Sequence, residues 1–154
     1  MAAVMGATYP DLYAAIGVHS GLPHGAAHDL PSAFTAMGGK GTRRHNGNFS
    51  SALKSAPIIA FHGDADGTVH ASNSVIVEAT EARLEVEQGE RNGRAFTRTT
   101  QFGADGRSVG EHWIVHGAGH AWAGGSAAGT FTDPRGPDAS REMLRFFLQH
   151  PYPP

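Results

Sequence analysis

The chain has 154 residues, no cysteine and a formal net charge of −2. This length suits one domain with a buried core, and 40% hydrophobic with 17% charged residues argues against general disorder. The absence of cysteine excludes disulfides, thiolate metal sites and a cysteine nucleophile. The near-neutral charge gives no electrostatic basis for binding nucleic acid or an anionic membrane, and no apolar run approaches the roughly 18 residues of a membrane span.

In the first half of the chain we predict two helices and two buried strands. Small apolar residues at 1–8 predict a tightly packed helix, and 13–18 predicts a buried strand that opens into a loop at Ser20. The polar segment 21–50 is predicted to be a loop with a short helix at 32–37. Continuous β-branched and aromatic residues at 57–62 predict the second buried strand.

In the second half, 71–87 is predicted to be a helix with a charged, solvated side. The segments 94–101 and 109–116 bracket a Gly-Ala-Asp-Gly turn at 103–106, which indicates a hairpin or a sharp strand connection. A loop rich in glycine and proline fills 117–137. Asp138 is predicted to cap a last helix that ends near Gln149 and packs the following residues inward: Met143, Leu144, Phe146, Phe147 and Leu148.

Strands that alternate with helices predict an α/β domain with a mostly parallel sheet flanked by helices. Such sheets bind ligands outside the carboxyl ends of their strands. Two motifs follow predicted strands in this way, HGDADGTV at 62–69 and GAGHAW at 117–122. They place an acid before a histidine, which is the chain order that a Ser-Asp-His hydrolase uses.

Asp66 and His120 are the candidate acid and base. A hydrolytic histidine needs a carboxylate that fixes its tautomer and stabilises the imidazolium, and only folding can bring together residues this far apart in the chain. The alternative is an Asx-type turn at Asp66 and an ordinary loop histidine at His120. Asp64 competes for the acid role, although we favour a structural role in which it accepts backbone N–H bonds within the turn. His62 and His70 flank the same loop and are expected to pack or bond locally.

Two sets of residues could bind a metal ion. His112, His116 and His120 recur every four residues and would align as ligands on a helix, but the Trp-Ile-Val segment at 113–115 favours a strand and the glycines at 117 and 119 would break a helix. The 62–66 segment offers histidine and aspartate ligands without a convincing further cluster. We therefore predict no metal and no cofactor, and a histidine-based metal-binding protein remains the least favoured function.

The segment 58–70, the GAGHAW motif and the closing helix from Asp138 to Met143 resemble the poly(3-hydroxybutyrate) depolymerase-like esterases of the α/β-hydrolase superfamily. The resemblance covers almost the whole chain but only the C-terminal half of that family's catalytic domain. It implies one partial α/β-hydrolase domain over 1–154, with Asp66 as triad acid and His120 as general base. It also implies an ester substrate, polyhydroxyalkanoate-like or small, and an extracellular location, with a cytoplasmic location as the alternative.

The family's nucleophile lies in a G-x-S-x-G elbow, and the small residues at 1–7 resemble the helix that follows this elbow. The resemblance therefore places the serine, and with it the oxyanion hole, just upstream of Met1. Ser20 is the weaker candidate, because valine and not glycine stands two residues before it; it is expected to line the pocket. Trp122 is expected either to line an ester-binding cleft or to be a buried structural tryptophan.

Three functions follow from these observations. The first is a serine ester hydrolase in which serine attacks the carbonyl, His120 transfers the proton and Asp66 orients His120. The second is a truncated, catalytically inactive fragment or interaction piece, and the third is the metal-binding protein. The sequence makes no prediction about oligomeric state.

Overall fold

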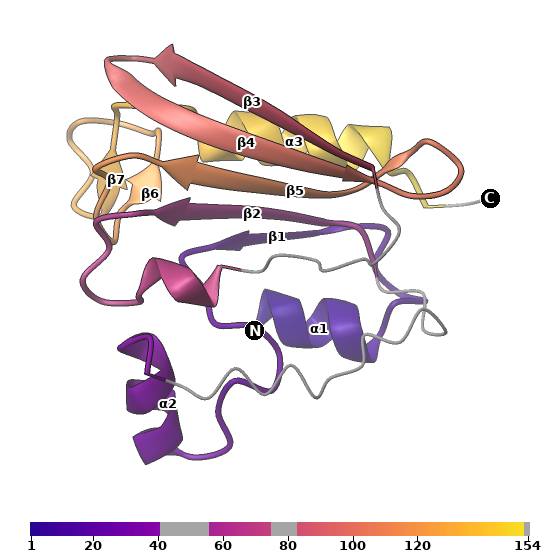
Figure 1. Ribbon diagram of the computed structural model, residues 1–154, viewed down its shortest axis with the longest axis horizontal. Helices are drawn as coiled ribbons and strands as arrows, with labels where there is room; N and C mark the ends of the chain where they lie inside the picture. The colour runs from indigo at the N-terminus through magenta and orange to yellow at the C-terminus, as the bar shows by residue number, and fades with distance from the viewer. Residues whose placement is uncertain (41–55, 75–82, 153–154) are drawn as a thin grey trace.

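The computed structural model describes residues 1–40, 56–74 and 83–152, and its main element is a five-stranded sheet of spatial order β1-β2-β5-β4-β3 (Figure 1). The strands are β1 (Ile16–His19), β2 (Ile58–Gly63), β3 (Arg83–Arg91), β4 (Arg94–Phe102) and β5 (Ser108–Val115). The helices are α1 (Ala2–Thr8), α2 (Leu30–Met37) and α3 (Ala139–Gln149), with a single 3₁₀ turn, η1 (Ala71–Asn73). Two short strands, β6 (Trp122–Ala123) and β7 (Thr132–Asp133), pair in parallel apart from the main sheet.

The prediction of a mostly parallel sheet flanked by helices, as the C-terminal portion of an α/β-hydrolase fold, is wrong. β1–β2 and β2–β5 pair in parallel, but β5–β4 and β4–β3 pair antiparallel. The sheet is therefore mixed, and its longest strands belong to the antiparallel half. The cause is two hairpins: the turn at 103–106 reverses the chain between β4 and β5, and a tight turn at Asn92-Gly93, where φ is +47° and +70°, reverses it between β3 and β4. Positive φ at both central residues is the type I′ geometry that closes a two-residue hairpin.

The prediction of a helix over 71–87 is also wrong in the residues of this range that the structure describes. Only η1 is helical, residues 83–87 belong to β3, and residues 75–82 lie outside the described part. Leu84 and Val86 alternate with glutamates, which is the period of two of a strand. These residues are a strand because they pair with β4. The pairing runs from Arg83 opposite Phe102 to Arg91 opposite Arg94.

The other predicted helices and strands are confirmed with shifted ends, whereas the loop predicted over 117–137 contains β6 and β7, and residues 41–50 of the loop predicted over 21–50 lie outside the described part. The first helix and the second buried strand are α1 and β2, while the strand expected at 13–18 begins only at Ile16. The turn at 103–106 joins β4 to β5 as a hairpin. Asp138 caps α3 by accepting a hydrogen bond from the Arg141 N–H at 3.1 Å.

The core lies on both faces of the sheet. On one face, α3 inserts Met143 and Phe146 into a buried cluster built by β2, β4 and β5. Three residues of α3 that were predicted to pack inward are instead exposed: Leu144, Phe147 and Leu148. On the other face, α1 packs against a smaller cluster that includes Ile16 and Ile58. One row of neighbouring rings runs across the strands on the first face, stacked from His19 to Trp113 and tilted between Trp113 and Phe96: His19, Phe61, Trp113 and Phe96.

The parallel half of the sheet positions the candidate residues. β1, β2 and β5 run in the same direction and end at the same edge, on the left in Figure 1. Ser20 follows β1, Asp66 follows β2 and His120 follows β5, so all three lie in connections that leave this edge. In the described residues we find no helix with the length and apolar character needed to cross a membrane.

Candidate functional site

Asp66 is held as a buried, ionised carboxylate by the loop that follows β2. Its Oδ1 accepts hydrogen bonds from the backbone N–H groups of Thr68 and Val69 at 2.9 and 2.8 Å, and its side chain is fully buried. Burial by itself would raise the pKa of Asp66, but the hydrogen bonds from Val69, His120 and Thr68 together hold that pKa below its usual value. The Asx-type turn proposed as an alternative to a catalytic role is therefore present, and it leaves Oδ2 available.

His120 uses that second oxygen. Its Nδ1 lies 2.7 Å from Asp66 Oδ2, a contact that joins residues 54 positions apart in the chain. Because the ionised carboxylate only accepts, Nδ1 carries the proton and Nε2 of the neutral ring has a free lone pair. The imidazole is 42% exposed, and within the described residues no group forms a hydrogen bond with Nε2. This is the tautomer and the access that a general base needs.

The two loops approach each other closely because residue 63 is glycine. A Cβ at Gly63 would lie 2.2 Å from the carbonyl oxygen of Ala118, which is part of the backbone and has little freedom to move. The same oxygen accepts a hydrogen bond from the Ala65 N–H at 3.1 Å. Glycine at the end of β2 thus lets the loop with Asp66 lie directly on the loop with His120.

His62 bonds to the loop that carries Asp66. Its ring is almost completely buried, and its Nε2–H donates to the Val69 carbonyl oxygen at 2.7 Å. The same nitrogen lies 3.5 Å from Asp66 Oδ2. The local bonding expected for His62 is therefore present, and it stabilises the turn in which Val69 donates to Asp66. The local bonding expected for His70 is present too: its Nδ1 accepts a hydrogen bond from the Ser72 N–H at 3.1 Å, while its backbone N–H donates to the Met37 carbonyl.

Ser20 does not meet His120. It adopts a left-handed φ of +49° at the end of β1 and is buried, and its Oγ lies 3.2 Å from Nδ1 of the neighbouring His19. Because the Ala123 N–H donates to His19 Nε2 at 2.9 Å, it is Nδ1 that carries the proton and donates to Ser20 Oγ. In the described structure Ser20 Oγ is bound to His19 and makes no hydrogen bond with His120.

His19, which the sequence reasoning overlooked, links Trp122 to the site. The Trp122 ring stacks on His19 at 4.8 Å between centroids and is 36% exposed, while its Nε1–H donates to Ser140 Oγ at 3.0 Å. Burial, followed by the charges of His62 and His120, lowers the pKa of His19 to about 4. A neutral histidine therefore stacks against a partly exposed tryptophan that lies two residues after His120 in the chain. A histidine directly after a strand, beside Ser20, was the available signal.

Asp64 binds a different histidine. Its Oδ2 lies 2.8 Å from Nδ1 of His116, and its Oδ1 accepts a hydrogen bond from the Gly117 N–H at 2.6 Å. Burial would raise the pKa of Asp64, and the bonds from His116 and Gly117 outweigh it, so that pKa is lowered. The structure brings Asp66, and not Asp64, to His120.

The three histidines considered as metal ligands do not share a helix. His112 lies in β5, while His116 and His120 each bind an aspartate beyond its end. Burial lowers the pKa of His112 to about 4. In the part of the chain that the structure describes, no three histidine or acidic side chains lie close enough to hold a metal ion.

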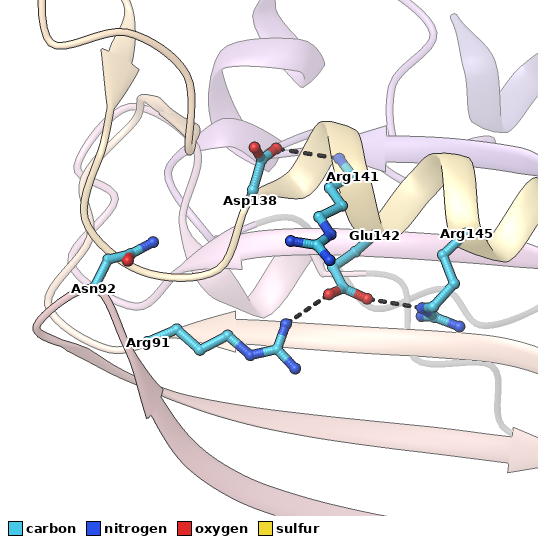
Figure 2. Close-up of a pocket in the computed structure, with 6 residues that line it drawn as sticks. All are labelled: Arg91, Asn92, Asp138, Arg141, Glu142 and Arg145. Carbon is cyan, nitrogen blue, oxygen red and sulfur yellow. Dashed lines mark hydrogen bonds and ion pairs between the residues drawn. The ribbon is translucent and has the colours of Figure 1, made fainter.

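The groove beside α3 is a separate feature (Figure 2). It has a volume of about 620 Å³ and is lined by Arg91, Asn92, Asp138, Arg141, Glu142 and Arg145. The Glu142 carboxylate accepts hydrogen bonds from Arg91 at 2.6 Å and from Arg145 at 2.8 Å, so its charge is already balanced. The groove includes neither Asp66 nor His120, and its charged groups join α3 to the hairpin.

No model of a known protein family and no curated protein matches this chain. The features of this chain that point to a function are therefore the geometry of Asp66 and His120 and the motifs that contain them.

Proposed function

We propose that this chain carries the acid and the general base of a serine ester hydrolase that resembles the poly(3-hydroxybutyrate) depolymerase-like esterases. The observation that carries the proposal is the 2.7 Å contact between buried Asp66 and half-exposed His120. Asp66 fixes the tautomer of His120 and stabilises the positive charge that the ring acquires, and His120 Nε2 is open to receive a proton.

The reaction that we propose has two stages. A serine Oγ attacks the ester carbonyl while His120 Nε2 takes its proton, and the protonated ring then passes this proton to the departing alkoxide, which leaves as an alcohol. Water, deprotonated by the same nitrogen, next attacks the acyl-serine, and the carboxylic acid leaves while serine recovers its proton. Asp66 remains ionised throughout.

The serine of this proposal precedes Met1. Two observations support this placement over Ser20: within the described residues His120 Nε2 has no partner, and Ser20 Oγ is engaged by His19. The substrate is proposed to be a polyhydroxyalkanoate-like ester or a small ester. The Trp122 ring, stacked on His19 and partly exposed, is proposed as an apolar wall for that ester.

The test is turnover of p-nitrophenyl butyrate by the protein expressed from the complete reading frame that contains residues 1–154. We expect His120→Ala to lower kcat/KM by about 10³-fold or more, because removal of a triad member leaves only binding and oxyanion stabilisation. His24→Ala, at an exposed loop histidine, is the matched control and should retain full activity. Equal activity of His120→Ala and the unsubstituted protein would refute the proposal.

The open Nε2 of His120 also favours a second candidate, in which residues 1–154 alone are catalytically inactive and act as a fragment or interaction piece. In that case the purified 154-residue chain shows no p-nitrophenyl butyrate turnover above its own His120→Ala variant. His120-dependent turnover by the 154-residue chain would exclude this candidate and would make an internal hydroxyl the nucleophile.

A further inference from the structure

A second aspartate–histidine pair lies beside the first. Asp64 and His116 are joined at 2.8 Å, as Asp66 and His120 are joined at 2.7 Å. The two pairs differ in environment, because the Asp64 and His116 side chains are 41% and 43% exposed whereas Asp66 is buried. A contact between two exposed side chains contributes little to stability, so attraction between the two side chains is not a sufficient account of this arrangement.

The Asp64 carboxylate also binds the backbone at the start of the loop that carries His120. Its Oδ1 accepts the Gly117 N–H at 2.6 Å, and Gly117 has a left-handed φ of +68°. Gly117 is the point at which the chain turns away from β5 and begins the short segment to His120. The carboxylate therefore holds the residue whose conformation sets the direction of that segment.

Backbone contacts on either side extend this attachment. The Asp64 N–H donates to the Val115 carbonyl at 3.3 Å, and the Ala65 N–H donates to the Ala118 carbonyl at 3.1 Å. His116 Nε2 lies 2.9 Å from the Thr97 hydroxyl of β4. The loop that carries Asp66 and the loop that carries His120 are thus joined by several backbone hydrogen bonds, and the Asp64 side chain adds a further one at Gly117.

We propose that Asp64 is a positioning residue that holds the loop from Gly117 to Ala121 so that His120 Nδ1 stays on Asp66 Oδ2. The inference rests on the proposed function, since it assigns Asp64 to the machinery of the same base. Neither oxygen of Asp64 contacts His120, so Asp64 acts through the backbone. A displacement of about 1 Å at a reacting group can cost about 100-fold in rate, and a loop that contains two glycines has little rigidity of its own.

The experiment compares Asp64→Ala with Asp64→Asn. Asparagine keeps an oxygen that can accept the Gly117 N–H, whereas alanine removes it. In the protein from the complete reading frame, we expect Asp64→Ala to lower kcat/KM for p-nitrophenyl butyrate about 10- to 100-fold, mainly through kcat, and Asp64→Asn to restore most of it. Asp105→Ala is the matched control, because Asp105 caps the Arg107 N–H in the same way at the opposite end of β5.

A second measurement reports on the dyad without any turnover. In proton NMR of the 154-residue chain, the charge-assisted Nδ1–H of His120 should give a low-field signal that is absent from His120→Ala. Asp64→Ala should broaden or shift this signal, while Asp64→Asn and Asp105→Ala should leave it in place. Asp64→Ser, whose side chain is too short to replace the carboxylate, gives the same comparison if Asp64→Ala does not fold.

The outcomes separate the two proposals. A perturbed His120 signal in Asp64→Ala, in a protein without esterase activity, would support the positioning role and refute the proposed function. Activity that depends on His120 but is unchanged in Asp64→Ala, with an unchanged signal, would leave the function standing and show that Asp64 is only a surface ion-pair partner.

Discussion

Lowering the pH from 7 to 5 should perturb two histidines that the fold keeps neutral, His19 and His112. Burial, with a further contribution from the charge of His62, lowers the pKa of each from 6.5 to about 4. In the unfolded chain both rings recover the ordinary value and bind protons near pH 6.5. Below that pH the unfolded state binds more protons than the folded state, so the free energy of unfolding falls as the pH falls.

The size of this effect follows from the two shifts. One pKa unit corresponds to about 1.4 kcal/mol, and the interval from pH 6.5 to 5 spans about 1.5 units of each shift. Each histidine therefore lowers the free energy of unfolding by about 2 kcal/mol at pH 5, and the two together lower it by about 4 kcal/mol. Since domains of this size have about 5–15 kcal/mol of stability, the loss should be easy to measure.

Urea denaturation at pH 7 and at pH 5 is the assay. In the unsubstituted chain the free energy of unfolding should fall by about 4 kcal/mol between the two. In His112→Gln, which replaces the ring with a side chain that does not titrate, it should fall by about half as much. His24→Gln, at an exposed loop position, should behave like the unsubstituted chain. A loss below about 1 kcal/mol, or an equal loss with and without His112, would refute the reasoning.

Three substitutions test the packing around the site. Gly63→Ala should lower His120-dependent turnover at least 100-fold, because the new Cβ would lie 2.2 Å from the Ala118 carbonyl oxygen and push the loops that carry Asp66 and His120 apart. Enzyme kinetics on the folded variant measure this effect, and normal turnover would contradict it. Trp113→Ala should cost about 3–5 kcal/mol in urea denaturation, because the ring is fully buried between two phenylalanines; a cost below about 1 kcal/mol would contradict the packing. Arg94→Ala should cost about 1.5–3 kcal/mol, because it removes the guanidinium 2.5 Å from Asp133 while Arg135 still bonds this carboxylate at 3.1 Å. An unchanged melting temperature would show that other groups replace Arg94.

Local patterns predicted the elements that carry the site. The apolar run at 57–62, the Asp-Gly turn at 105–106 and the Asp138 cap each have one dominant local solution, and the structure has β2, the β4–β5 hairpin and α3 at these places. The strand β3 was missed because its first residues also fit a helix with one charged side. The Asn92-Gly93 dipeptide was the signal for the β3–β4 hairpin, which adds a second antiparallel pair to the one that the β4–β5 turn already makes.

The sequence identified the acid and the base as candidates, but it could not determine their pairing. Asp64 and Asp66 are separated by one residue, and either could reach a histidine beyond β5. The register of β2 on β5, which places Gly63 opposite Val115, sets which carboxylate meets which imidazole. His19 depends in the same way on a contact 104 residues along the chain, to Ala123.

The most direct test of the central claim is the activity of Asp66→Asn in the protein from the complete reading frame. Asparagine keeps the size of the side chain but removes the charge that orients His120 and stabilises its protonated form. We predict a fall of about 10³- to 10⁴-fold in kcat for p-nitrophenyl butyrate, with the fold retained. An Asp66→Asn protein that turns over within about twofold of the unsubstituted enzyme would contradict the assignment of Asp66 and His120 as the acid and base.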